Sequence, residues 1–246
     1  MNRYSHMLGR LAFGVVLALS ATVCAAAVAR PALDPDFEAL VREKGEAART
    51  LILHPTLDRV AKIDGLPCTA SDFEFLLDRP RASVALAGRL HKSLDRYDIQ
   101  VTGPGLYHID DQKELVGDME VISMGHGKRL YYLTGYWKLV LGVKLRGSMA
   151  LVVEYADRAP GQKMTDAKAR GYMLVDSSVA GAALKLLVNL FPKKVDARIN
   201  RFATSVVKVV EGLHDDPSGT LTRLEKSPRV PAEEVREFRE RFGGGV

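Results

Sequence analysis

Two periods of hydrophobic positions divide the chain, and the change between them predicts its fold class. Over residues 34–91 apolar side chains recur at three- and four-residue spacings, a pattern typical of amphipathic helices. Over residues 99–176 the period falls to two, with breaks at glycine, proline and aspartate, which predicts strands joined by short turns. Helical spacing returns over residues 178–213. We therefore expect an α+β fold, with N-terminal helices and a curved antiparallel sheet of about five or six strands gripping a long C-terminal helix.

Several helix boundaries can be placed from single residues. Ser71 and Glu74 have the spacing of a capping box and predict that a helix begins near residue 71. Pro192 lies inside the last apolar stripe, where it removes a backbone donor and is expected to kink or divide the helix. We expect a loop over residues 215–219 and a short charged helix over residues 231–242.

The clearest strand is predicted over residues 143–155. Its odd positions are apolar, whereas its even positions begin with Lys144 and Arg146 and end with Glu154, so one face is buried and the other is wet. A straight strand of this length would be unusually long for a globular protein. The sheet is therefore expected to be strongly twisted and curved.

The first residues have the layout of a secretory signal peptide. Arg3 and Arg10 flank the start of an apolar run over residues 11–23, and small alanines follow. We expect cleavage after Ala27 or Ala29, and a periplasmic or secreted protein. The chain would then comprise a signal peptide and three further segments: residues 1–29, a helical extension over 30–70, a main domain over 71–213, and a C-terminal loop and short helix over 214–246.

Composition and charge narrow the function classes. With 47% hydrophobic and 26% charged residues among 246, the chain is not a disordered polymer. The net charge of +5 invites a nucleic-acid interpretation. However, Arg3 and Arg10 belong to the signal peptide, and the remaining excess lies within residues 181–213. We therefore expect no nucleic-acid partner. Without the signal peptide, Cys68 is the single cysteine, so no intramolecular disulfide can form.

The order of elements resembles the START-like, or SRPBCC, helix-grip superfamily. The resemblance rests on that order, on the strand pair around residues 131–136 and 145–155, and on the closing helix, and it covers about residues 71–213. It implies a curved antiparallel sheet around a long C-terminal helix with an apolar pocket between them. Members of the superfamily typically bind lipids, sterols or other apolar small molecules, and a minority catalyse cyclisation or dehydration in that pocket.

The apolar faces of the predicted strands and of the closing helix supply the candidate ligand-binding residues. They are Met119, Val121, Tyr132, Met149, Leu151, Val153, Met173, Leu187, Phe191 and Phe202. The same pattern fits a solid core equally well, because periodicity reports burial and not empty volume. Basic residues of the closing helix, Lys193, Lys194, Arg198 and Arg201, are candidates for contact with an anionic membrane surface or for a solvated outer face.

No residue pattern identifies an enzyme. Asp110 and Asp111 could serve as acids, although adjacent aspartates at a strand end are usually turn formers. His108 and His126 have no metal-ligand spacing, so we predict no metal, cofactor or catalytic residue. The sequence favours an exported carrier of a lipid or other apolar small molecule. A cyclase or isomerase using the same pocket, and a ligand-free structural protein of the envelope, stay open as alternatives.

Overall fold

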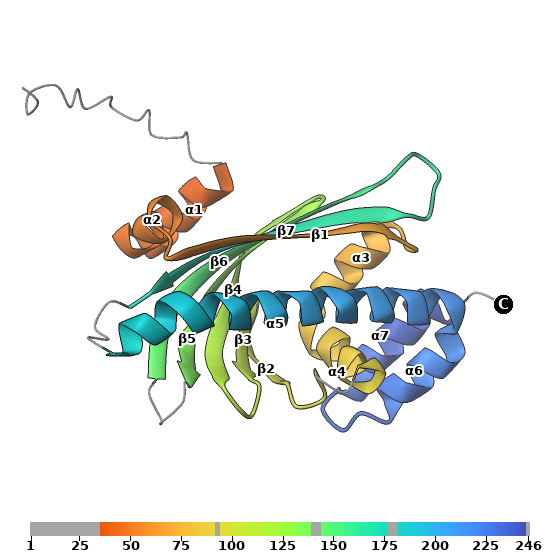
Figure 1. The fold of residues 1–246 in the computed structure, drawn as a ribbon. Coiled ribbons are helices and arrows are strands. Elements are labelled where there is room, and N and C mark those ends of the chain that lie inside the picture. Colours follow the sequence, from red (N-terminus) through yellow and green to blue (C-terminus); the bar gives the residue numbers. More distant parts are fainter. Residues whose placement is uncertain (1–34, 92–93, 139–143, 177–181, 245–246) are drawn as a thin grey trace, which may run out of the picture. The chain divides into compact units, whose positions relative to one another are not determined.

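The structure is a computed structural model that describes residues 35–91, 94–138, 144–176 and 182–244 (Figure 1). The predicted signal peptide lies outside these residues. In chain order the elements are α1 (Pro35–Lys44), α2 (Glu46–Leu53), β1 (Leu57–Leu66), α3 (Ala70–Leu77), α4 (Pro80–Leu90), β2 (Asp98–Gly103), β3 (Leu106–Asp110), β4 (Leu115–Gly125), β5 (Lys128–Lys138), β6 (Lys144–Asp157), β7 (Thr165–Val175), α5 (Ala182–Asp215), α6 (Pro217–Glu225) and α7 (Ala232–Phe242).

The strands form one antiparallel sheet in the order β1-β7-β6-β5-β4-β3-β2. Strands β2 to β7 pair with their neighbours in the chain, as short turns require. The predicted α+β class, with one antiparallel sheet and a long C-terminal helix, is confirmed.

The first strand of the sheet corrects the expected run of helices over residues 34–91. Leu57–Leu66 is β1, an edge strand that pairs with β7, about 100 residues later in the chain. Its positions alternate between half-buried and exposed, but the exposed set includes the apolar Val60. The half-buried set in turn includes the charged Arg59, so these two neighbours hide the period of two. A pairing so distant in sequence leaves no local signal.

Two helix starts also differ from the prediction. The capping box of α3 is formed by Thr69 and Asp72: the Thr69 side chain accepts the Asp72 N–H at 3.1 Å, and the Asp72 carboxylate accepts the Thr69 N–H at 3.2 Å. The box expected at Ser71 and Glu74 is therefore two residues too late. Similarly, the loop expected over residues 215–219 is the start of α6, where Asp216 accepts the Gly219 N–H at 2.9 Å.

The longest helix, α5, has 34 residues and contains Pro192 without being divided there. It lies against the face of the sheet that carries Tyr131 and Leu151, which we call the inner face. The opposite, outer face carries Leu130, Ala150 and Tyr172 and is covered by α1 and α2. There the rings of Phe37 and Tyr172 meet edge to face with centroids 5.3 Å apart. The helices α1 and α2 on the outer face are therefore additional to the expected arrangement, in which the sheet grips one long helix.

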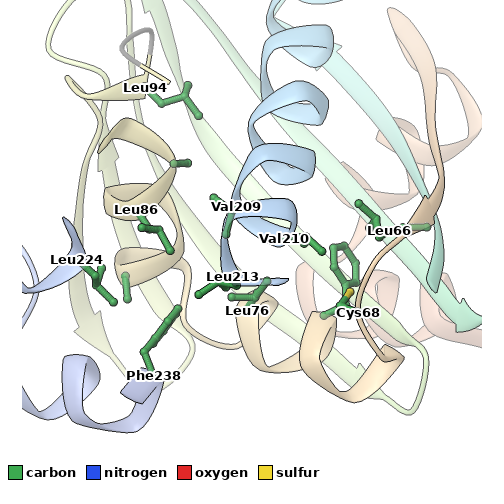
Figure 2. Packing of buried hydrophobic residues seen from close by; sticks show 14 of the residues in the cluster. Leu66, Cys68, Leu76, Leu86, Leu94, Val209, Val210, Leu213, Leu224 and Phe238 are labelled. Carbon is green, nitrogen blue, oxygen red and sulfur yellow. The ribbon is translucent and has the colours of Figure 1, made fainter. Parts of the chain in front are cut away.

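The main hydrophobic core lies between the inner face and the C-terminal half of α5, and the helices α3, α4, α6 and α7 enclose it (Figure 2). Val209, Val210 and Leu213 of α5 pack there against Leu76, Leu86, Leu224 and Phe238. We call this the large core cluster. A small core cluster of Trp137, Leu145 and Val195 lies nearer the other end of α5.

Cys68 belongs to the large core cluster and is expected to be chemically inert. Its side chain is 9% exposed, and burial raises the pKa of its thiol to about 11. The Cys24→Ser variant of the full chain keeps Cys68 as its single thiol. In this variant we expect an aromatic disulfide reagent at pH 8 to react with Cys68 only after the protein is unfolded in urea. Rapid modification of the folded protein would contradict the buried position.

Three glycines lie side by side across the centre of the sheet. Gly117 of β4 pairs with Gly135 of β5, which pairs with Gly147 of β6. A Cβ atom on Gly135 would lie 2.4 Å from the carbonyl oxygen of Val116, and one on Gly147 would lie 2.5 Å from that of Leu174. The backbones here approach more closely than any side chain permits. Glycines in such positions are a recognised way to bend a sheet.

Candidate functional site

A zone of half-buried apolar side chains lies between the two core clusters on the inner face. The strands contribute Leu133, Met149, Leu151 and Met173, and α5 contributes Ile199 and Phe202. We call these six residues the middle zone. Leu133 and Leu151 pack against the large core cluster, whereas Met173 and Ile199 pack against the small one. Met149 pairs in register with both Leu133 and Met173 and so connects the two halves.

The partial exposure of the middle zone distinguishes it from the cores on either side. Val209 and Val210 of α5 are 4% and 2% exposed, whereas Val206 and Phe202, one and two turns earlier, are only half-buried. Among the strands, α5 contacts mainly the edge strand β1. Apolar surface that remains accessible beneath a covering helix is the usual lining of a small-molecule site.

Apart from Tyr132, the predicted ligand-binding residues fall into three groups. Met149, Leu151, Met173 and Phe202 belong to the middle zone. Met119 and Val153 are buried in the large core cluster, and Val121 packs against it, so these three fill the core. The side chains of Leu187 and Phe191 lie outside the described residues.

Tyr132 is a correction to the predicted set. It pairs with Glu120 and Ala150, which lie on the outer face, whereas its neighbour Tyr131 points to the inner face. Adjacent residues of a strand point to opposite faces, so an error of one residue moves the side chain across the sheet. Beneath the outer helices, the ammonium group of Lys44 lies 5.8 Å from the Tyr132 ring centroid.

Two ion pairs hold α5 across the sheet. On the β1 side, Arg59 Nε donates to Asp196 Oδ1 at 2.5 Å. On the side of the β3–β4 turn, Arg198 Nη2 donates to Asp111 Oδ2 at 2.8 Å. Residues two apart on a helix project about 200° from each other. Asp196 can therefore reach β1 on one side of α5, while Arg198 reaches the β3–β4 turn on the other side of the same helix. Val195 and Ile199 between them pack towards the sheet.

Arg198 is buried, which corrects its assignment as a membrane contact. Its side chain is 8% exposed, its guanidinium carbon lies 4.3 Å from the Trp137 ring centroid, and Glu114 Oε2 lies 3.4 Å from Nη2. Arg198 follows Val195 by three residues and precedes Phe202 by four, so it belongs to the apolar stripe itself. That spacing is the sequence signal that the prediction missed.

The other basic residues assigned to the membrane remain on the surface. Lys193, Lys194 and Arg201 are exposed, and Lys194 Nζ lies 3.6 Å from Glu114 Oε1. Within the described part of the chain, no helix combines the length and the apolar character needed to cross a membrane.

Asp111 organises the turn between β3 and β4. It is completely buried, and its Oδ1 accepts the backbone N–H groups of Lys113, Glu114 and Leu115 at 3.0, 2.6 and 2.8 Å. Burial by itself opposes ionisation, but the three backbone donors and the charge of Arg198 outweigh it and hold the pKa of Asp111 below its ordinary value. Of the two roles considered for Asp111, the turn former is the one that these bonds support.

A second buried arginine joins α3 to the inner face. Arg129 of β5 has a side chain that is 3% exposed, and it donates to Asp78 Oδ1 at 2.9 Å and to Glu74 Oε1 at 2.6 Å. The hydrogen bond to Asp78, assisted by Glu74, raises the pKa of Arg129 against the opposing effect of burial. Burial chiefly raises the pKa of the adjacent Tyr155 and of Tyr131, so both phenols stay neutral.

Two open depressions on the surface have linings of mixed polar and apolar character. One, of about 510 Å³, lies between the α3–α4 connection, the β2–β3 hairpin and α7, and includes Arg81, Tyr107 and Glu234. The other, of about 450 Å³, lies at the ends of β5, β6, β7 and β1 and includes His126. Neither is lined by a predicted ligand-binding residue. His108 is elsewhere, with Nδ1 2.7 Å from Asp118 Oδ1.

Comparison with known proteins gives structural similarity alone. No family model and no curated protein matches the sequence. Among solved structures, Ara h 8.0201 is 9% identical with a TM-score of 0.40, and the matched region covers 63% of this chain and 98% of that one. A START superfamily protein from Mycobacterium smegmatis is 11% identical with a TM-score of 0.41, over 64% of this chain and 97% of that one.

The di-domain ARO/CYC protein BexL from the BE-7585A biosynthetic pathway is 14% identical with a TM-score of 0.38, over 70% of this chain and 61% of its own. The assignment of the fold rests on the sheet order and on the place of α5. With one antiparallel sheet and a long C-terminal helix across its inner face, the chain has the START-like helix-grip fold that its element order resembles.

Proposed function

We propose that the protein is an exported carrier that binds a lipid or other apolar small molecule in the middle zone, between the sheet and α5. The observation that carries the proposal is the half-buried state of six apolar side chains beneath a helix, with a packed core on each side. Two of the six are methionines, whose unbranched side chains adapt to ligands of different shape.

The ionisable groups around the zone support binding rather than catalysis. Asp111 and Arg198 are engaged with each other, and Arg129 is engaged with Asp78 and Glu74. A general acid or base must be free to transfer a proton in reach of the substrate. These groups instead hold helices to the sheet.

Export and membrane contact belong to the same proposal. The layout of residues 1–29 supports an exported protein. Lys193, Lys194 and Arg201 lie exposed on the helix that covers the zone, where they would attract anionic lipid headgroups. A carrier of this kind would touch a membrane with α5 while it takes up or releases its ligand.

A glycine beside the zone offers a direct test. Gly171 of β7 pairs with Leu151 on the inner face, and a Cβ atom there would make only an ordinary contact, 3.7 Å from Met149 Sδ. We expect Gly171→Leu to fill the zone and to weaken binding of the neutral probe N-phenyl-1-naphthylamine at least about tenfold, which is about 1.4 kcal/mol. Binding would be followed by the probe's fluorescence.

The control places the same side chain on the other face. Thr134→Leu adds a leucine at an exposed position of β5 on the outer face, and should leave the affinity for the probe unchanged. Native mass spectra of the protein purified from its host should also show a bound apolar molecule. If the wild type takes up neither probe nor lipid, or if Gly171→Leu binds as well as the wild type, the proposed site is wrong.

A further inference from the structure

Three buried donor nitrogens next to the middle zone have no hydrogen-bond acceptor in the described part of the chain. They are Nε and Nη1 of Arg198 and Nε of Arg96. Arg198 is 6% exposed as a whole residue. Buried polar atoms are nearly always hydrogen-bonded, and one left without a partner costs free energy, so a cluster of three requires an explanation.

A purely structural role accounts for only part of this arginine. One nitrogen, Nη2, makes both contacts that hold α5 to the β3–β4 turn, with Asp111 and with Glu114. A guanidinium carries five N–H donors in a planar fork that suits a carboxylate. The tie between helix and sheet leaves Nε and Nη1 of Arg198 available to a further acceptor.

The position of Arg198 places these donors at the border of the middle zone. Ile199 is the next residue, and Phe202 lies one turn further on the same side of α5. The Phe202 ring packs on Tyr97, with centroids 5.4 Å apart, and Arg96 precedes Tyr97. Arg96 Nη2 lies 3.7 Å from the same Asp111 oxygen that Arg198 contacts, so both guanidinium groups converge on this corner.

The charges around this corner do not cancel. Arg96, Arg198 and Lys194 carry positive charge, whereas Asp111 and Glu114 carry the negative charge that faces them. The cluster therefore has one positive charge in excess, at a place where Arg198 and Asp111 are shielded from water. A single negative charge would neutralise this excess. Hydrogen bonds to a charged oxygen are stronger than those to a neutral acceptor.

We infer that the ligand is an amphiphile with one carboxylate, whose oxygens accept hydrogen bonds from Arg198 and Arg96 while its apolar tail lies in the middle zone. The inference rests on the proposed function, because it names the head group of a ligand held at that site. It assigns Arg198 two roles: Nη2 fixes α5, and the remaining donors select the ligand.

The test compares two ligands that differ only in the head group. Hexadecanoate and hexadecan-1-ol, each below its aggregation limit, compete with N-phenyl-1-naphthylamine for the exported protein at pH 8. We expect hexadecanoate to displace the probe at a concentration at least about tenfold lower. In Arg198→Gln this preference should fall to about one while the probe still binds. Lys208→Gln removes an exposed cation from the same helix, outside the proposed membrane-contact set, and should keep the full preference.

Each outcome bears on one of the two proposals. If the wild type binds both ligands equally, the carboxylate site is overturned and the proposed carrier function stands. If neither ligand nor probe binds, the carrier function itself fails. Should Arg198→Gln lose its near-ultraviolet circular dichroism signal, Arg96→Gln serves instead, because Arg96 is one-third exposed and makes a longer contact with Asp111. An undiminished preference in a folded variant of either arginine would overturn the inference.

Discussion

Replacing Asp111 by alanine is expected to lower the free energy of unfolding by roughly 3–5 kcal/mol, one of the two largest effects we predict for a single residue. The change removes the acceptor of three backbone N–H groups and leaves Arg198 buried with only the longer contact to Glu114. Urea unfolding followed by circular dichroism would measure it. Asp110→Ala is the matched control, because Asp110 is half-buried and its carboxylate accepts the Gln112 N–H; it should cost about 1 kcal/mol.

The same carboxylate predicts a dependence on pH. Because the pKa of Asp111 is lower in the folded protein than in the unfolded chain, its ionised form stabilises the fold above the unfolded value of about 3.9. That contribution is lost as the pH falls through the lower, folded pKa. The difference in unfolding free energy between wild type and Asp111→Ala should therefore narrow below about pH 4. A difference that stays constant from pH 7 to pH 3 would contradict the ionised, hydrogen-bonded state.

Gly135→Ala is expected to cost about 3 kcal/mol or more, or to prevent folding, although it adds one methyl group. That group would lie 2.4 Å from the Val116 carbonyl oxygen and 2.7 Å from the Gly117 Cα, and both are backbone atoms that cannot turn aside. Thermal unfolding and the yield of soluble protein would report the effect.

Gly171→Ala is the control for backbone entropy and strand propensity. It lies in the same sheet, but its added methyl group would meet only Met149 Sδ at 3.7 Å. We expect its stability to remain within about 1 kcal/mol of the wild type. Equal effects of the two substitutions would show that the close approach of the strands at Gly135 does not control stability.

Local patterns predicted the elements whose partners lie nearby in the chain. Strands β2 to β7 pair with their neighbours in the chain, so the sheet and its closing helix could be predicted from the local period of apolar positions. β1 was not predicted as a strand, because its partner is distant in the sequence and because the exposed Val60 interrupts the alternation. The capping box was misplaced because Thr69 and Asp72 present the same spacing two residues earlier.

The candidate site was predictable only as a set of inward positions. Alternation separates one face of a strand from the other, and an offset of one residue put Tyr132 on the wrong face. It does not distinguish Val153, which is buried in the core, from Leu151, which is only half-buried. Arg198 was assigned to the surface because it is charged, although its spacing from Val195 and Phe202 places it on the buried stripe. How deeply a side chain is buried, and which residues it pairs with, depend on the assembled sheet and not on local spacing.

The pairing of the first strand with the last also determines the order in which the sheet can be assembled. β1 cannot gain its neighbour until β7 has been made and has emerged, so α1, α2 and β1 wait for most of the chain. The Arg59–Asp196 contact adds α5 to the same event. Contacts between such distant segments slow folding, because a long loop must close before they form. The sheet should therefore stay incomplete at β7 until late in folding, and the edge strand should be the last to dock.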